Sequence, residues 1–109
     1  MKDIKAVYFV GAGGIGMSAI ARYFIKKGLV VAGYDKTPST LTRQLEKEGM
    51  LIHYEENVDE IPRACLHPES CLVVYTPAVP AEHAELQYFR QHGFDIQKRA
   101  QVLGTLTRQ

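Results

Sequence analysis

The sequence has no tryptophan, only two cysteines and no long hydrophobic run among its 109 residues. A membrane-spanning helix needs about 20 consecutive apolar residues, and the N-terminal residues have the pattern of a strand rather than of a signal peptide. Cys65 and Cys71 have neither Cys-x-x-Cys spacing nor a secretory context, so we expect free thiols in a reducing cytoplasm. These absences argue against a membrane protein and against a disulfide scaffold.

An excess of charge of one sign is also lacking, because 13 basic and 12 acidic residues leave a net charge of +1. The basic residues are scattered, which argues against nucleic acid and other polyanionic partners. Cys65, His67 and Cys71 match no usual zinc spacing and lack a fourth ligand, so we expect no metal site. A chain of this length is expected to form a single domain.

Two motifs of nucleotide and ester chemistry are missing as well. No segment fits Gly-x-x-x-x-Gly-Lys-Ser/Thr, and the dipeptide Gly-Lys does not occur, which excludes a Walker-type ATP site. No serine lies in a Gly-x-Ser-x-Gly turn, which excludes the nucleophile elbow of many hydrolases.

The segment from Lys5 to Asp35 carries the pattern around which the chain is organised. Residues 6–10 form an apolar run rich in β-branched and aromatic side chains, typical of a strand buried on both faces. An amphipathic helix from Met17, a second strand over 29–34 and the carboxylate of Asp35 follow. Between the first strand and the helix, the motif Gly-x-Gly-x-x-Gly comprises Gly11, Ala12, Gly13, Gly14, Ile15 and Gly16. Because a helix N-terminus attracts anions, this arrangement predicts a site for a phosphate-containing ligand.

Strands and helices alternate along the rest of the chain. We expect a helix with Thr37 as N-cap and Pro38 in its first position, ending near Glu48. Further strands are predicted at 50–53, 71–76 and 94–98, and further helices at 82–92, carrying His83 and His92, and at 99–109. We interpret the acidic run over 55–60 as a solvated loop. The alternation predicts the α/β class, a Rossmann-like three-layer domain with a parallel sheet of about five strands and helices on both faces.

Ligands of such sheets bind beyond the carboxyl ends of the strands, where the strand order reverses. The residues that follow the predicted strands are small, polar or charged, and they are therefore candidates for the binding site. They are the glycine motif 11–16, then Asp35, Lys36 and Thr37, then His53, then Thr76, Pro77, Ala78 and Val79, and finally Arg99.

The C-terminal residues 104–109 stop within a helical pattern, without a cap or a polar tail. A natural domain rarely ends in this way, so we expect the sequence to be a fragment of a longer protein.

Several segments, in order and with compatible spacing, carry a family signature. They are residues 9–18, Gly33–Asp35, Ile52-His53 with Glu56–Val58, Val73–Val79 and Arg99–Leu103. Together these segments resemble the N-terminal domain of the Mur ligases of peptidoglycan (cell wall) synthesis, and within that family the branch that adds L-alanine. The resemblance covers essentially the whole chain.

The resemblance implies that the full protein joins L-alanine to the lactyl carboxylate of UDP-N-acetylmuramate, with ATP and Mg²⁺ as expected cofactors. Members of the family have an N-terminal domain that holds the UDP-sugar, a central ATPase domain and a C-terminal amino-acid domain. Residues 1–109 resemble the first alone, so the fragment is expected to bind the UDP moiety, to need no cofactor of its own and to catalyse nothing by itself.

The resemblance also suggests roles for the candidate residues. The N–H groups of 13–16 would hold the diphosphate, and the Ser18 hydroxyl would add a donor. Asp35, Lys36 and Thr37 would lie near the uridine, and His53 would donate to the uracil or to a phosphate. Thr76 and the turn over 77–79 would line the sugar side of the cleft. Arg99 would face a phosphate or the substrate carboxylate.

Three alternatives remain open from the sequence. A nicotinamide-dinucleotide domain of a dehydrogenase or redox-sensing regulator would have the same pattern through Asp35, since an acid there binds the adenosine ribose. The glycine turn could also serve only for packing, in a domain that binds no nucleotide. Within the family, a ligase that recycles murein tripeptide shares much of the pattern.

Overall fold

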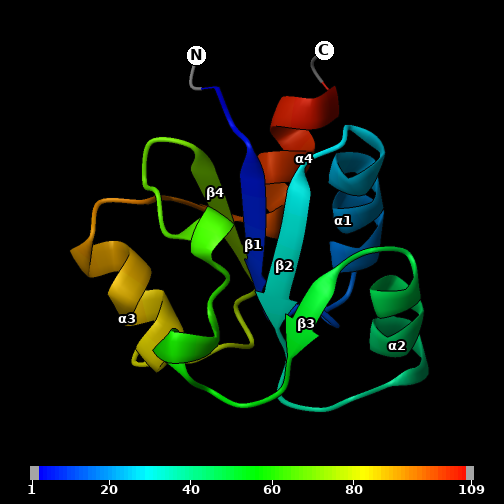
Figure 1. Cartoon of the computed structure of the whole chain (residues 1–109), viewed down its shortest axis with the longest axis horizontal. Helices are drawn as coiled ribbons and strands as arrows, with labels where there is room; N and C mark the ends of the chain where they lie inside the picture. Colours follow the sequence, from blue (N-terminus) through cyan, green and yellow to red (C-terminus); the bar gives the residue numbers. More distant parts are fainter. Residues whose placement is uncertain (1–2, 108–109) are drawn as a thin grey trace.

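The computed structural model describes residues 3–107 and shows a parallel sheet between layers of helices (Figure 1). The strands are β1 (Ala6–Val10), β2 (Val30–Tyr34), β3 (Leu51–His53), β4 (Cys71–Tyr75) and β5 (Asp95–Lys98). The helices are α1 (Met17–Lys26), α2 (Thr40–Lys47), α3 (Ala84–Gln91) and α4 (Arg99–Thr107). Two short 3₁₀ turns, η1 (Val58–Glu60) and η2 (Arg63–Cys65), lie between β3 and β4.

The sheet has the order β3-β2-β1-β4-β5, and every pairing is parallel. The central strand β1 is buried along its whole length, as its continuous apolar run predicts. Strand order reverses at β1, because the chain builds outward to β3 on one side and then returns to β4 on the other. The predicted α/β class and strand number are confirmed.

Alternate residues of the strands point into two separate cores. Val7 and Phe9 pack under α1, α2 and α4 on one face of the sheet. Tyr8 and Val10 pack on the other face, against α3 and the two 3₁₀ turns. Helices therefore cover both faces, and α3 lies apart from the other three helices (Figure 1). No helix within residues 3–107 is both long and apolar enough to cross a membrane.

Two helices begin later than the sequence pattern predicts. Ser39, rather than Thr37, caps α2: its hydroxyl accepts from the Thr42 N–H, and the Thr42 hydroxyl accepts from the Ser39 N–H in return. The Thr37 N–H instead donates to the Asp35 carboxylate at 3.0 Å, which keeps Thr37 and Pro38 in the preceding turn. Helix α3 begins at Ala84 with His83 as its N-cap. The predicted helical residues 108–109 lie outside the described part of the chain.

The close approach of β2 to β1 makes a specific prediction at Gly33. A Cβ atom at this position would lie 2.6 Å from the Phe9 carbonyl oxygen, a backbone atom that cannot move away without disturbing the central strand. We expect Gly33→Ala to lower the free energy of unfolding by about 3 kcal/mol, measured by urea denaturation of the chain.

Gly104→Ala is the matched control, because nothing lies within 4 Å of its added Cβ and the position is in α4. It should raise stability by about 0.5 kcal/mol. Equal effects of the two substitutions would contradict the packing argument.

Candidate functional site

The carboxyl ends of the strands form one row along an edge of the sheet. In the parallel register, Val10 of β1 pairs with Tyr34 on one side and Tyr75 on the other, Tyr34 pairs with His53, and Tyr75 pairs with Lys98. The residues immediately after the last paired positions of β1, β2, β4 and β5 are Gly11, Asp35, Thr76 and Arg99. Residues far apart in the sequence therefore meet where the strand order reverses, the usual place for a ligand in such sheets.

A cleft of about 550 Å³ opens at this edge, a volume in the range of small-molecule sites. Of the residues predicted from the sequence, it is lined by Gly11, Gly13, Gly14, Asp35, Lys36, Thr76, Ala78 and Val79. It is also lined by four residues that the sequence did not single out as site residues, namely Tyr34, Glu56, Pro80 and His83. The predicted residues that do not line it are Ala12, Ile15, Gly16, Ser18, Thr37, His53, Pro77 and Arg99.

The glycine motif packs tightly against its neighbours at the cleft. Gly11 has φ of 95°, and a Cβ there would lie 2.4 Å from the Thr76 methyl group, so only glycine fits beside β4. The Gly13 N–H donates to the Asp35 carboxylate at 2.6 Å, and the Gly14 N–H donates to the Gly11 carbonyl at 3.0 Å. Two of the N–H groups predicted to hold a diphosphate are therefore already bonded, one to Asp35 and one within the loop.

The positive end of α1 remains open to an anion. Within the described chain, the N–H groups of Ile15 and Gly16 have no hydrogen-bond partner, and the first turn of α1 contains no acidic residue and no side-chain cap. Arg99 lies over this end of the helix, because a Cβ at Gly16 would lie 3.0 Å from its guanidinium Nη1. A cation beside a helix N-terminus is unfavourable alone, so the arrangement favours binding of a phosphate between them.

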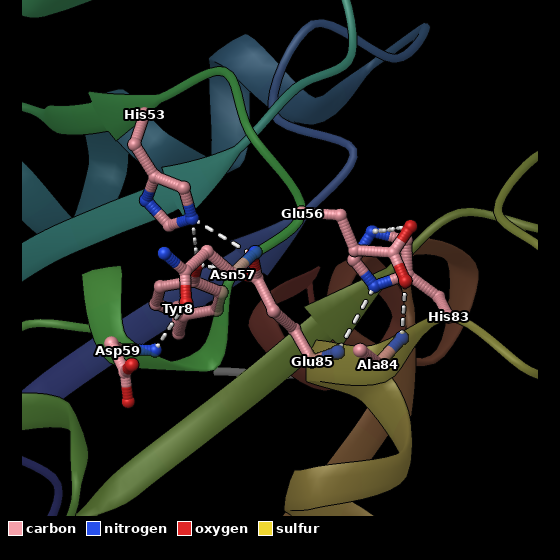
Figure 2. Close-up of polar contacts among 8 residues, drawn as sticks. All are labelled: Tyr8, His53, Glu56, Asn57, Asp59, His83, Ala84 and Glu85. Atoms are coloured by element: carbon pink, nitrogen blue, oxygen red, sulfur yellow. Dashed lines mark hydrogen bonds and ion pairs between the residues drawn. The ribbon is translucent and has the colours of Figure 1, made fainter.

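Behind the cleft lies a buried cluster of polar groups around Glu85, a residue that the sequence analysis missed (Figure 2). Its carboxylate accepts hydrogen bonds from the Tyr8 hydroxyl, from His53 Nε2 at 2.8 Å and from the Asn57 N–H at 3.0 Å. Nε2 of His53 is thus engaged inside the fold by Glu85. Glu85 belongs to the inward face of α3 together with Leu86 and Phe89, so helical periodicity alone could have identified it.

The four acidic residues of the run over 55–60 are exposed, as predicted, but two side chains of the segment also bond to the fold. The Glu56 carboxylate accepts from the Ala84 N–H at 2.7 Å, at the N-terminus of α3. Asn57 caps η1 by accepting from the Asp59 N–H at 2.9 Å. The open N-terminal N–H groups of α3 and η1 attract these side chains. The segment therefore fastens the β3–β4 connection to α3, and it brings Glu56 to the cleft wall.

Known proteins of one family are similar to this chain. Residues 6–109 match the profile described as "Mur ligase family, catalytic domain". The UDP-N-acetylmuramate–L-alanine ligase of Parabacteroides distasonis is 64% identical over 108 residues, which are 99% of this chain and 23% of that protein. The ligase of the same name from Flavobacterium johnsoniae is 52% identical over 99% of this chain and 24% of that protein. The chain therefore spans under a quarter of the length of either relative.

Two solved structures have the same fold. The UDP-N-acetylmuramate-alanine ligase of Thermotoga maritima superposes with a TM-score of 0.81 and 32% identity, over 94% of this chain and 23% of that one. The UDP-N-acetylmuramate:L-alanyl-gamma-D-glutamyl-meso-diaminopimelate ligase of Neisseria meningitides superposes with a TM-score of 0.75 over 92% of this chain and 30% of that one. At 18% identity the second likeness concerns the fold alone. The proteins named here are all ligases, and none supports a nicotinamide-dinucleotide domain.

The buried cluster predicts loss of stability in alkali. Burial first, and then the adjacent Glu85 carboxylate, raise the pKa of Tyr8 far above its ordinary value of 10.0. Above that value the unfolded chain releases the Tyr8 proton while the folded chain keeps it, so this group lowers the free energy of unfolding by about 1.4 kcal/mol per pH unit. We expect Tyr8→Phe to make the decline between pH 10 and 12 shallower by that amount, measured by urea denaturation.

The baseline for this comparison is pH 8 to 9. There the free energies of unfolding of the wild type and of Tyr8→Phe should change with pH in parallel. Curves that stay parallel up to pH 12 would contradict the raised pKa of Tyr8.

Proposed function

The chain belongs to the Mur ligase family, and from this premise we propose that it is the part of a UDP-N-acetylmuramate–L-alanine ligase that holds the UDP end of the substrate. The observation that carries the proposal is the cleft at the carboxyl ends of β1, β2 and β4. It lies beside the open N-terminus of α1 and Arg99. The identity of 64% with a ligase of that name supports this substrate over the tripeptide of the recycling relative.

In the full protein, the lactyl carboxylate of UDP-N-acetylmuramate would be phosphorylated by ATP to an acyl phosphate, which the amine of L-alanine attacks with release of phosphate. This sequence contains no P-loop, so ATP and Mg²⁺ would be held by the rest of such a ligase. The contribution of this segment is binding and orientation, in partnership with the remaining domains. We place the reaction in the cytoplasm, where the two free cysteines stay reduced.

The diphosphate would lie at the N-terminus of α1, bonded by the N–H groups of Ile15 and Gly16 and facing Arg99. Ser18, in the first turn of α1, would add a hydroxyl donor. The uridine would lie over Asp35, Lys36 and Thr37, at the end of β2. The turn after β4, with Thr76, Pro77, Ala78 and Val79, would line the sugar side.

The first test is thermal and urea unfolding of the chain with UDP-N-acetylmuramate, UDP, NADH and ATP, each in separate titrations. A ligand that binds only the folded chain raises its free energy of unfolding by about 2.7 kcal/mol at a hundredfold excess over its Kd. We expect this stabilisation from the two uridine compounds alone. Stabilisation by NADH alone, or by none of the four, would contradict the proposal.

Arg99 provides a second test of the phosphate site. We expect Arg99→Ala to weaken binding of UDP about tenfold and to reduce its dependence on salt, because a charge-assisted contact with the diphosphate is lost. Isothermal titration calorimetry at two salt concentrations measures both effects.

The matched control is Arg63→Ala, which removes an exposed arginine of η2 on the opposite face of the sheet from α1. Equal weakening by the two substitutions would show that Arg99 acts only through net charge.

A further inference from the structure

The wall of the cleft contains a buried hydrogen-bonding atom with no partner. The His83 side chain is 4% exposed, and within the described chain its Nε2 atom makes no hydrogen bond. An unpaired buried polar group destabilises the fold, so such an atom calls for an explanation. His83 also lines the cleft, although it is far from the glycine motif in the sequence.

The contacts of the ring determine what Nε2 offers. Nδ1 of His83 accepts a hydrogen bond from the Glu85 N–H at 3.2 Å, as the N-cap of α3 (Figure 2). A neutral imidazole whose Nδ1 accepts carries its proton on Nε2. The ring of Tyr34 packs against the imidazole, with centroids 4.7 Å apart, and fixes its orientation. His83 Nε2 is therefore a positioned donor.

A positioned acceptor lies beside this donor. Oε2 of Glu56 is fastened to the Ala84 N–H, and Oε1 lies 3.7 Å from His83 Nε2, longer than a hydrogen bond. The Glu56 side chain is 45% exposed and lines the same cleft. Oε1 makes no hydrogen bond within the described chain, so a ligand oxygen that displaces it from beside His83 would reach the Nε2 donor. The donor and the acceptor cannot exchange roles, since the carboxylate has no proton and the imidazole proton is fixed by the cap.

We propose that His83 and Glu56 recognise the imide edge of the uracil base, and this inference rests on the proposed function. His83 Nε2–H donates to the O4 carbonyl oxygen of uracil, and Glu56 Oε1 accepts from the neighbouring N3–H. Cytosine presents the reverse pattern at this edge, with an amino donor toward His83 and a ring nitrogen acceptor toward Glu56. The pair therefore selects uridine over cytidine nucleotides, because cytosine sets a donor against the His83 donor and an acceptor against the Glu56 acceptor.

The test is isothermal titration calorimetry of the chain with UDP and with CDP, which share the same ribose and diphosphate. The wild type should bind UDP roughly a hundredfold more tightly than CDP. In His83→Asn, the shorter side chain keeps an oxygen for the Glu85 N–H cap but loses the Nε2 donor. It should bind UDP roughly tenfold more weakly while its melting temperature stays unchanged.

Glu56→Gln should reverse the hydrogen-bonding preference of the group that faces the ring nitrogen of the base. Its amide retains an oxygen for the Ala84 N–H and presents an N–H₂ donor to the base, which suits the cytosine ring nitrogen. We expect weaker UDP binding and tighter CDP binding in this variant. The matched control is His92→Asn at the other end of α3, outside the cleft, which should leave both affinities unchanged.

The outcomes separate this inference from the proposed function. Equal binding of UDP and CDP by the wild type, or equal weakening of both by His83→Asn and Glu56→Gln, would overturn base recognition by this pair and leave UDP binding intact. Arg99→Ala should weaken UDP and CDP alike, since it acts on the phosphates. Binding of neither nucleotide would contradict the proposed function, and the base-recognition inference with it.

Discussion

The fully buried carboxylate of Glu85 is the interaction on which the geometry of the site depends. Burying a carboxylate costs several kcal/mol unless donors replace its water. Here β1 supplies the Tyr8 hydroxyl, β3 supplies His53 and the following loop supplies the Asn57 N–H (Figure 2). The position of Glu85 in the first turn of α3 adds the favourable end of the helix dipole. One side chain thus joins two strands, a loop and a helix.

This cluster has a direct consequence for the cleft. Because Glu85 fixes the first turn of α3, its N–H is available to His83 Nδ1 and sets the tautomer of that ring. The same first turn holds Glu56 through the Ala84 N–H. The α3 side of the cleft therefore presents a donor and an acceptor in fixed roles, and the α1 side presents open N–H groups near Arg99. Such a distribution suits a ligand with a phosphate at one end and a hydrogen-bonding base at the other.

Asp35 shows how one sequence pattern can serve two kinds of nucleotide site. An acid after the second strand binds the adenosine ribose in dinucleotide domains. In this structure its carboxylate accepts from Gly13 and Thr37, so it shapes the turn of the glycine motif instead. The N–H groups that stay open to an anion consequently lie toward the start of α1, where Ile15 is 95% exposed at the tip of the loop.

The sequence by itself determined the order and type of the strands and main helices, because buried runs, helical periodicity and glycine turns are local signals. It also identified the row of residues after the strands, since parallel strands place their carboxyl ends at one edge. The tertiary structure alone decided which hydrogen bonds those residues make. Asp35 accepts a hydrogen bond from Gly13, and His53 bonds to Glu85. Ser39 replaces Thr37 as the cap of α2, and Glu56 of the acidic run bonds to the start of α3. Each of these partners is distant in the sequence or competes with a neighbour, and only the packed fold determines which pairing forms.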